Sequence, residues 1–455
     1  MEMYDLMVLG GGPGGYLCAE RAAQGGMKVV LFEQEHMGGT CLNEGCIPTK
    51  TLLNSAKLYR HATGSADFGV TAQGVVFDHA KAVERKSRVV KTLVSGVEGT
   101  MRSHKITVVR ESAVIAGRGE KGFLVKAGNE LYNGARLTIA TGSETVIPPV
   151  KGLKEGLADG FVVTNKEVLD LDSLPKELVV IGGGVIGLEM ACYFASVGSH
   201  VTVIEMMPKI AGATDADICR ILMDIYGKSG MEFKLSCKVL EVGTDRVIYE
   251  ENGEKKTVCC DKVLLSAGRR ASTAGIGLET LGIEQVRGAI TTDKYLCTNV
   301  ANVYAVGDCN GKLMLAHTAY REAEVAVNHM LGIRDEMRYD VIPSVIYTDP
   351  EVACVGLSLE AAREKGINAK EIKLPMMFSG RYVAENENGK GFIKLIVDTD
   401  KKRLLGCHMI GSYASETILA VTMMIDTELP PSRLQKIVFP HPTVGEVIRE
   451  ALFTI

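Results

Sequence analysis

Two cysteines stand close together near the amino end of the chain, in the stretch GGTCLNEGCIPTK that runs from Gly38 to Lys50. Cys41 and Cys46 follow a segment typical of a strand and precede one typical of a helix. Two sulfurs so spaced at the first turn of a helix can reach bonding distance, and a helix N-terminus lowers the pKa of a thiol. A disulfide that closes so small a loop adds little stability. The spacing therefore favours a redox-active disulfide, with metal ligation and inert thiols as the alternatives.

A second chemical group stands near the other end of the chain, in HPTVGE from His441 to Glu446. Imidazole titrates near neutral pH and can act as a base. A carboxylate on the other ring nitrogen would fix the tautomer and stabilise the protonated ring. By composition alone, a surface salt bridge between His441 and Glu446 is the alternative.

The elements that must position these groups begin with an internal repeat. Residues 4–33 and 177–205 both read as an apolar strand, a glycine cluster, a helix and a second strand that ends in Glu. Each copy carries G-x-G-x-x-G, whose glycines allow a tight turn, a close approach of a pyrophosphate and helix–strand packing. The helix N-terminus supplies N–H groups for the phosphates. The two sets are Gly10, Gly12 and Gly15 with Glu33, and Gly182, Gly184 and Gly187 with Glu205. The sequence thus predicts two dinucleotide sites.

The second copy favours NAD over NADP. The carboxylate of Glu205 would repel a 2′-phosphate, and the following Met206, Met207 and Pro208 offer no arginine to bind one.

Composition sets the remaining bounds. The 455 residues suffice for about three domains, and the formal charge of −4 gives no basic footprint for nucleic acid. No apolar run reaches the roughly 18 residues that a membrane span needs, and the amino end has no signal-peptide pattern. Most of the 12 cysteines are scattered singly, as in a reducing compartment. We therefore expect a cytoplasmic protein without a structural metal site.

The fold expected is α/β, with two Rossmann-like dinucleotide-binding domains and a C-terminal α+β domain. The VIPPVKG segment at 146–152 marks a boundary. From about Asp340 the pattern changes to alternating strands and a helix.

GGTCLNEGCIPTK, the two glycine fingerprints and HPTVGE together resemble the dihydrolipoamide dehydrogenases, which are FAD-dependent pyridine nucleotide–disulfide oxidoreductases. They are the E3 components of 2-oxo acid dehydrogenase complexes and of the glycine cleavage system. The resemblance runs from Tyr4 to about Leu452. It implies a homodimer and four domains: FAD-binding at 1–145, NAD-binding at 146–270, a central domain at 271–340 that completes the FAD site, and an interface domain at 341–455.

The same resemblance assigns roles to the redox residues. Cys46 faces the flavin, and Cys41 exchanges with the dithiol substrate. Lys50 lies beside the reactive end of the flavin and pairs with Glu189. His441, oriented by Glu446, is the base that reaches the disulfide of the other subunit.

The resemblance also assigns the cofactor contacts. The first fingerprint with Glu33 holds FAD, and the second with Glu205 holds NAD. Further FAD contacts come from Ala113 at the adenine, Asp308 at the ribityl chain and the backbone of Ala316, and further NAD contacts come from Val239, Ala267 and Gly268. His317, next to Ala316, is expected to be a packed core residue without chemistry.

The implied activity is oxidation of protein-bound dihydrolipoyl groups with reduction of NAD. The implied partner is a lipoylated carrier: the E2 of a 2-oxo acid or acetoin dehydrogenase complex, or the H protein of glycine cleavage. One alternative, a glutathione-type disulfide reductase, would want arginines after the second fingerprint. The other, a flavoprotein partner without turnover, is disfavoured by the intact Cys41, Cys46, His441 and Glu446.

Overall fold

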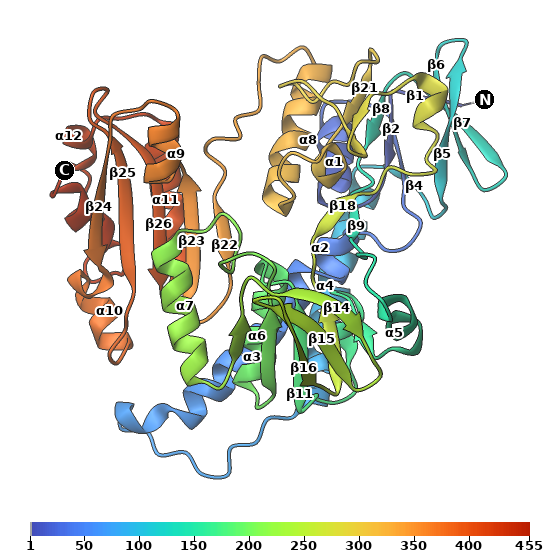
Figure 1. The fold of residues 1–455 in the computed structure, drawn as a ribbon. Coiled ribbons are helices and arrows are strands. Elements are labelled where there is room, and N and C mark those ends of the chain that lie inside the picture. Colours follow the sequence, from blue (N-terminus) through green and yellow to red (C-terminus); the bar gives the residue numbers. More distant parts are fainter. Residues whose placement is uncertain (1) are drawn as a thin grey trace.

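The computed structural model describes residues 2–455 and has three lobes (Figure 1). The amino-terminal lobe, joined by a segment from the middle of the chain, lies at the upper right of Figure 1. The second lobe lies below it, and the carboxy-terminal lobe lies to the left. Among residues 2–455, no helix combines the length and hydrophobicity needed to cross a membrane.

The first domain is built on a five-stranded parallel sheet in the order β21-β8-β2-β3-β4. Its strands are β2 (Leu6–Leu9), β3 (Val29–Phe32), β4 (Thr107–Val109), β8 (Leu137–Ile139) and β21 (Val303–Ala305). The inner strands LMVL and VVLF are buried at every residue, as expected for parallel strands covered on both faces.

Each face of this sheet has its own cover. Leu6 and Val8 point to one face and pack with helices α1 (Pro13–Gln24), α4 (His79–Ser103) and α8 (Ala316–Met330). Met7 and Leu9 point to the other face, because side chains alternate along a strand. There they pack on a sheet in the order β1-β7-β6-β5, formed by β1 (Met3–Tyr4), β5 (Ala113–Gly119), β6 (Gly122–Ala127) and β7 (Glu130–Gly134).

Residues 271–340, expected to form a central domain, pack mainly on the first domain. Strand β21 extends the parallel sheet, and α8 packs directly on α1. The segment also holds the hairpin β19 (Gln285–Val286) and β20 (Ala289–Ile290) and the short helices η3 (Leu278–Leu281) and η4 (Gly307–Asn310).

The second domain repeats the plan of the first. Its parallel sheet has the order β10-β17-β11-β12-β13, formed by β10 (Val162–Val163), β11 (Glu177–Ile181), β12 (His200–Ile204), β13 (Glu232–Lys234) and β17 (Lys262–Leu265). One face packs on α6 (Val185–Ser196) and α7 (Ala216–Lys228). The other packs on the antiparallel meander β14 (Lys238–Val242), β15 (Arg246–Glu251) and β16 (Glu254–Cys259). The chain passes between the two domains through the antiparallel pair β9 (Ser143–Thr145) and β18 (Arg269–Ala271). The second domain also holds α5 (Leu153–Asp159), which packs on β10 and β14, and the short helix η2 (Glu167–Asp170).

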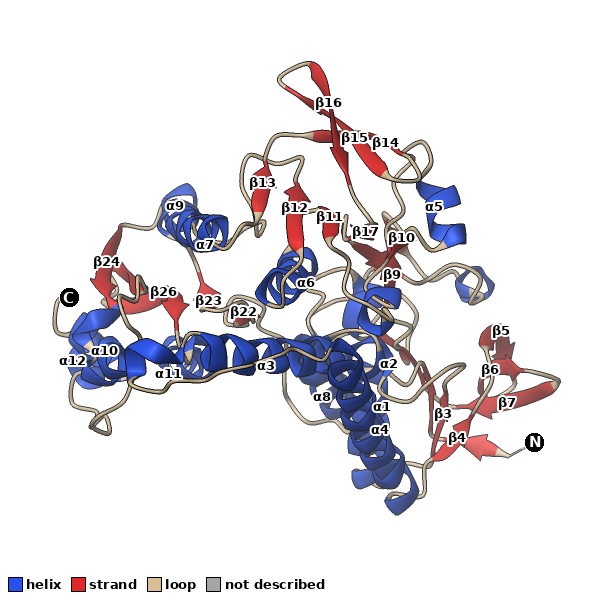
Figure 2. Cartoon of the chain, turned by 90° about the horizontal axis from the view of Figure 1, so that it is seen from below, coloured by secondary structure: helices blue, strands red, loops and turns tan. Residues whose placement is uncertain are grey.

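Two helices between β3 and β4 connect the lobes. The short α2 (Gly39–Asn43) is followed by α3 (Cys46–Thr63), which packs against α4 and α6, and by η1 (Ser65–Phe68). Seen from below, α3 runs from the first domain toward the carboxy-terminal lobe (Figure 2).

The third domain is an antiparallel sheet in the order β22-β23-β26-β25-β24. Its strands are β22 (Ser344–Ile346), β23 (Glu351–Gly356), β24 (Ala369–Pro375), β25 (Phe392–Asp398) and β26 (Arg403–Gly411). Its helices are α9 (Leu359–Glu364), η5 (Met376–Phe378), α10 (Gly380–Glu385), α11 (Ala414–Asp426), α12 (Pro431–Leu434) and α13 (Glu446–Leu452). Four of its buried side chains, among them Phe392 and Ile410, belong to the same core cluster as α6 and α7. The second and third domains therefore share a hydrophobic interface.

Candidate active site

The two glycine fingerprints have nearly the same backbone. Gly10 and Gly182 have φ of 102° and 105°, a region that disfavours side chains. A Cβ on Gly10 would lie 2.3 Å from the carbonyl oxygen of Ala140, and one on Gly182 would lie 2.5 Å from that of Ser266. The backbone of each βα turn therefore packs directly against the next strand of its sheet, which only glycine permits.

The third glycines bring helix and strand together in the same way. A Cβ on Gly15 would lie 1.8 Å from the oxygen of Gly10, and one on Gly187 would lie 2.3 Å from that of Gly182. The helices that begin here, α1 and α6, are capped by Gly12 and by its counterpart in the second repeat, without a side-chain hydrogen bond. Their first N–H groups are free to bind an anion.

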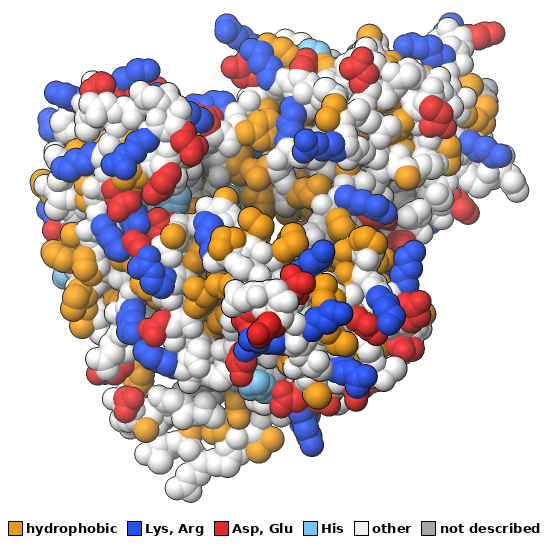
Figure 3. Space-filling view, viewed as in Figure 1, with side chains coloured by type: hydrophobic (Ala, Val, Ile, Leu, Met, Phe, Trp, Pro, Cys, Tyr) orange, Lys and Arg blue, Asp and Glu red, His pale blue; other side chains and the backbone are white. Residues whose placement is uncertain are grey.

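The middle glycines differ in what covers them. Around Gly184 no atom lies within 4 Å of an added Cβ, so its backbone faces the open space that a pyrophosphate requires. Gly12 is closely approached by Gly39 of α2, where an added Cβ would lie 2.7 Å from the Cα of Gly12. At either fingerprint, a side chain on the middle glycine would occupy the space that a dinucleotide needs. Glycine keeps that space clear, so both fingerprints form a cradle that fits a dinucleotide. The surface is hollowed and lined with hydrophobic side chains between the first domain and the other two (Figure 3).

The acids at the strand ends are held by backbone N–H groups. Glu33 accepts hydrogen bonds from Gly11 N at 2.8 Å and from Glu35 N at 2.7 Å. Glu205 accepts them from Gly183 N and Met207 N, both at 2.7 Å. Each carboxylate is thereby fixed beside its fingerprint, and its remaining lone pairs can accept hydrogen bonds from ribose hydroxyls.

The cysteine pair lies where α2 meets α3. Cys46 is the first residue of α3, while Cys41 lies in the preceding short helix, so the two thiols come from two helices. Both side chains are half-buried. A hydrogen bond from the Cys41 thiol, with help from the Lys50 ammonium, lowers the pKa of Cys46 to about 7 despite burial. The same contact and burial raise the pKa of Cys41. In the reduced pair, Cys46 is therefore the cysteine that loses its proton more readily.

Lys50 lies one turn further along α3 and meets a buried acid. Its Nζ is 2.8 Å from Oε2 of Glu189, a residue of α6 that is only 3% exposed. The other oxygen of Glu189 accepts a hydrogen bond from Tyr347 N at 2.9 Å, and the Tyr347 ring lies 4.5 Å from the same ammonium. One residue from each domain thus meets beside the cysteines. Sequence reasoning missed Tyr347, because a backbone donor and a ring face leave no pattern.

Asp308 lies in η4, directly after β21. It accepts a hydrogen bond from the Ser143 hydroxyl, and Arg269 binds the same hydroxyl at 2.7 Å. Sequence reasoning missed Glu322, a fully buried residue of α8 that accepts hydrogen bonds from Gly307 N and from the Asn310 side chain. Burial raises the pKa of Glu322. The signal was present, because AYREAEVAV places this acid on the apolar stripe of the helix.

The other residues assigned to cofactor contacts lie on β5, α8, β14 and the segment after β17. Ala113 begins β5 and packs in the cluster that holds Phe32, the neighbour of Glu33. Ala316 is the first residue of α8. Val239 in β14 packs in the cluster that holds Ile204. Ala267 and Gly268 follow β17 against the second fingerprint, and an added Cβ on Gly268 would meet open space.

The expected packed position of His317 is wrong. This side chain is exposed, and its Nε2 lies 2.7 Å from the carbonyl oxygen of Pro343. The residue falls in the first turn of α8, on the side away from the buried stripe of that helix.

His441 and Glu446 form a pair at the opposite end of the chain. Nδ1 of His441 lies 2.9 Å from Oε1 of Glu446, whose other oxygen accepts a hydrogen bond from Thr443 N at 2.9 Å. These two contacts lower the pKa of Glu446, the Thr443 bond most. The His441 side chain is 78% exposed, which leaves its Nε2 free to take a proton.

Within one chain the histidine and the cysteines lie apart. Helix α13, which begins at Glu446, packs on β24, β25 and η5 of its own domain, and α2 packs on α3 and α4. In Figures 1 and 2 alike, the carboxy-terminal end lies at one side of the molecule and α2 near its middle. The two chemical groups therefore do not form one site within a single chain.

Two parallel sheets, each with a nucleotide fingerprint, and a cysteine pair beside the first are the features of a flavin-dependent disulfide reductase. The family model for the pyridine nucleotide-disulphide oxidoreductases matches residues 4–323, and the model for their dimerisation domain matches residues 342–452. The chain belongs to this family and carries its dimerisation domain.

Similar proteins span the whole chain. The chain is 38% identical to the dihydrolipoyl dehydrogenase of Chlamydia muridarum, over 99% of this chain and 96% of the relative. It is 37% identical to that of Bacillus subtilis, over 98% and 97%. Among solved structures, the flavoprotein disulfide reductase RclA of Escherichia coli has a TM-score of 0.88 at 29% identity, covering both chains completely. LpdA of Mycobacterium tuberculosis has a TM-score of 0.90 at 24% identity over 99% of both chains, a likeness of fold.

Proposed function

We propose that this chain is an NAD-dependent dihydrolipoyl dehydrogenase that oxidises dihydrolipoyl groups on a lipoylated carrier protein. The observation that carries the proposal is the cysteine pair at the junction of α2 and α3 beside the first fingerprint, where Cys46 begins a helix and has the lower pKa. The similarity to dihydrolipoyl dehydrogenases along the whole chain supports the same substrate. The scattered, mostly buried cysteines fit a reducing compartment such as the cytoplasm.

The thiol pair determines the direction of exchange. In the oxidised enzyme Cys41 and Cys46 share a disulfide, and a substrate thiolate attacks one of its sulfurs. The sulfur with the lower pKa leaves more readily, so the attack falls on Cys41 and Cys46 departs as the thiolate. The second substrate thiol then attacks the mixed disulfide, which releases the oxidised lipoyl group and leaves both cysteines reduced.

His441 handles the protons of this exchange. Its Nε2 takes the proton of the first substrate thiol. When the second thiol attacks, the ring gives a proton to the departing Cys41 and takes the proton of that second thiol, so it ends protonated beside the Cys46 thiolate. Glu446 accepts a hydrogen bond from Nδ1–H, which fixes the tautomer and stabilises the charged ring.

The first cradle fits FAD, which when bound supplies the two-electron acceptor that links the thiols to the nicotinamide. In this proposal the residues Gly10, Gly12, Gly15 and Glu33 hold its nucleotide end, with Ala113, Asp308 and Ala316 at its further contacts. The Lys50 ammonium favours the Cys46 thiolate, and the buried Glu189 carboxylate, which opposes it, holds that ammonium in place.

The second cradle fits NAD rather than NADP. Glu205 lies beside the second fingerprint, where its carboxylate would repel a 2′-phosphate, and Met206 and Met207 after it are 67% and 56% exposed. An anionic carboxylate and two thioethers give a phosphate no favourable partner. Gly182, Gly184 and Gly187, with Val239, Ala267 and Gly268, complete the proposed NAD contacts.

The active site is completed by a second copy of the chain. His441 is exposed in one chain and lies apart from that chain's own cysteines. The dimerisation domain also exposes large apolar side chains on α11, with Leu419 at 60% and Met423 at 61% exposure. A homodimer would cover this face and bring His441 of one chain to Cys41 of the other.

The test is a substrate panel with the FAD-loaded dimer: dihydrolipoamide or a reduced, dihydrolipoyl carrier protein with NAD or NADP, and glutathione disulfide with NADH or NADPH. We expect turnover of dihydrolipoyl groups with NAD. Cys46→Ser should abolish that turnover and retain FAD, whereas Cys259→Ser, at an exposed cysteine of β16, should leave it unchanged. Activity confined to NADPH with glutathione disulfide, or full turnover by Cys46→Ser, would overturn the proposal.

A further inference from the structure

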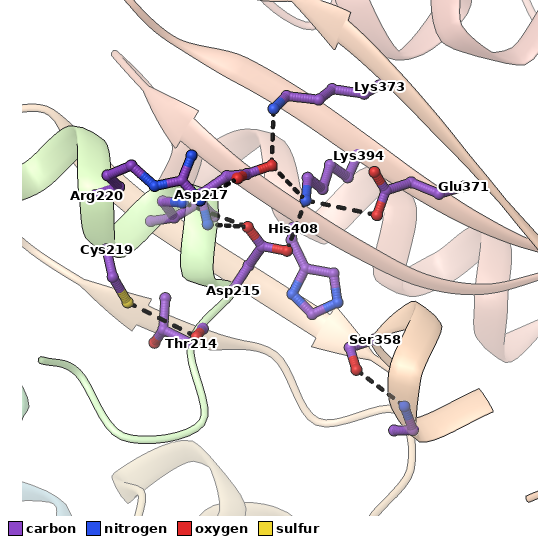
Figure 4. A network of polar contacts seen from close by, with 12 residues as sticks. Thr214, Asp215, Asp217, Cys219, Arg220, Ser358, Glu371, Lys373, Lys394 and His408 are labelled. Carbon is purple, nitrogen blue, oxygen red and sulfur yellow. Dashed lines mark hydrogen bonds and ion pairs between the residues drawn. The ribbon is translucent and has the colours of Figure 1, made fainter. Parts of the chain in front are cut away.

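A buried lysine joins the second and third domains through a cluster of carboxylates (Figure 4). Lys394, on β25, is 5% exposed, and its Nζ lies 2.8 Å from Asp215, 2.9 Å from Asp217 and 3.5 Å from Glu371. Lys373 adds a second ammonium, 2.8 Å from Asp217. Two of the three carboxylates belong to the second domain, so the charge contacts cross the domain interface.

The closest of these carboxylates also starts a helix. Asp215 is the N-cap of α7, and its Oδ1 accepts hydrogen bonds from Asp217 N at 2.9 Å and Ile218 N at 3.3 Å. Its Oδ2 is the atom that contacts Lys394. Because the two oxygens have separate partners, the lysine fixes the side chain that determines where α7 begins.

The loop that ends at this cap lies against the second fingerprint. Ala211 N donates to the carbonyl oxygen of Gly183 at 2.8 Å. Ile210 is fully buried, and an added Cβ on Gly183 would lie 3.3 Å from its Cγ2. The thiol of Cys219, in the first turn of α7, contacts the carbonyl oxygen of Ile210 at 3.3 Å. The same loop starts at Glu205, the proposed ribose acid.

These contacts form a continuous path of four steps. It runs from Lys394 of the dimerisation domain to Asp215, through the first turn of α7 to Ile210, and from there to Gly183 of the fingerprint. The apolar cluster shared by the two domains surrounds it, since Ile210 and Phe392 belong to that cluster. The Phe392 ring also lies 5.7 Å from the Lys394 ammonium.

We propose that Lys394 is a positioning residue for the NAD site, which holds the loop 206–214 against the second fingerprint from the neighbouring domain. The inference rests on the proposed function, because it takes the second fingerprint to bind NAD. It links dinucleotide binding to the domain through which two copies associate. Without the lysine, the cap and the loop 206–214 are less ordered before NAD binds. Binding must then order them, which costs free energy and lowers the affinity for NAD.

A purely structural role would predict a different outcome. Lys390 joins the same helix to the same domain, with its Nζ 2.6 Å from Asp224, but Asp224 lies beyond the first turns of α7 and takes no part in the path. If the ion pairs serve only to join the domains, Lys394→Met and Lys390→Met should both lower the melting temperature without a selective change in NAD affinity.

The experiment compares Lys394→Met, Asp215→Asn and Lys390→Met in the full-length, FAD-loaded dimer. Asn caps helices as well as Asp does, so Asp215→Asn keeps the cap and removes the charge. If Lys394→Met fails to fold, the NADH affinity of Asp215→Asn alone tests the inference. The readouts are the Kd for NADH by equilibrium dialysis, KM for NAD and for dihydrolipoamide, and amide hydrogen exchange over residues 206–214.

We expect the first two variants to raise Kd for NADH and KM for NAD about tenfold, within the range typical of coupled sites. Exchange in the loop should become faster, while KM for dihydrolipoamide and the FAD content stay as in the wild type. Lys390→Met should change none of these. Unchanged NADH affinity in a folded Asp215→Asn variant would overturn the inference. If the wild type itself failed to bind NADH, the proposed function would fail instead.

Discussion

The charge balance around Cys46 gives a prediction whose sign can be tested in both directions. The hydrogen bond from Cys41 lowers the pKa of Cys46 most, burial raises it, the Lys50 ammonium lowers it, and the Glu189 carboxylate raises it. Replacing Lys50 by Met removes a cation and should raise the pKa of Cys46. Replacing Glu189 by Gln removes an anion and should lower it.

The magnitude follows from burial. An opposite charge a few ångströms away shifts a pKa by about one to three units. The Lys50 side chain is 30% exposed, so solvent screening places the effect at the low end, about one unit or ~1.4 kcal/mol. A rise of the Cys46 pKa from about 7 by that amount would reduce the thiolate at pH 7 from about half to about one tenth of the molecules. Alkylation of Cys46 at pH 7 should then slow about fivefold.

The assay is the rate of alkylation of the reduced, FAD-loaded enzyme by iodoacetamide as a function of pH, with mass spectrometry to separate Cys46 from Cys41. Lys50→Met should move the midpoint for Cys46 up, and Glu189→Gln should move it down. The amide oxygen of the new Gln can still accept the hydrogen bond from Tyr347 N, so the site keeps its shape. Midpoints that moved in the same direction in both variants would refute the electrostatic reasoning.

Four further outcomes follow from the geometry. Gly184→Ala should weaken NAD binding without changing the melting temperature. Gly187→Ala should destabilise the fold by about 1–3 kcal/mol, because its Cβ would lie 2.3 Å from a carbonyl oxygen. Thermal melting combined with NADH titration distinguishes the two effects. Glu446→Gln should slow dithiol oxidation about a hundredfold but spare reduction of an artificial acceptor by NADH. Burial lowers the pKa of His79, so the folded state binds this proton less readily than the unfolded state does. The free energy of unfolding should therefore decrease as the pH is lowered below about 6.5. His79→Gln should flatten the plot of melting temperature against pH. Leu419→Asp should give monomers in light scattering, with FAD bound and dithiol turnover lost; a variant that stayed dimeric would place the interface elsewhere.

The sequence pattern predicted the features whose contacts lie within one short segment of the chain. The fingerprints specify their own turns, because glycine at Gly10 and Gly182 is required by backbone contacts within one βαβ unit. The acids Glu33 and Glu205 follow at fixed spacing for the same reason. Composition and periodicity also indicated the fold class and the third domain, since buried parallel strands and alternating strands have different signatures.

Contacts between distant segments could not be predicted in that way. Lys394 meets Asp215 across 179 positions, and nothing in either segment identifies the other. The cysteines were expected in one helix, but a turn at Glu44 and Gly45 divides the segment into α2 and α3. The histidine next to Ala316 was placed inside because its neighbours are apolar, and the rotation of the helix carries it outward.

The backbone of α2 lies over the first fingerprint, where Gly39 approaches Gly12, while the corresponding Gly212 of the second repeat has open space around it. A nucleotide seated on the first fingerprint would therefore be covered by the helix that bears Cys41. Its release would require that helix to move, and Cys41 with it. The second nucleotide can come and go with every cycle while the thiols remain undisturbed.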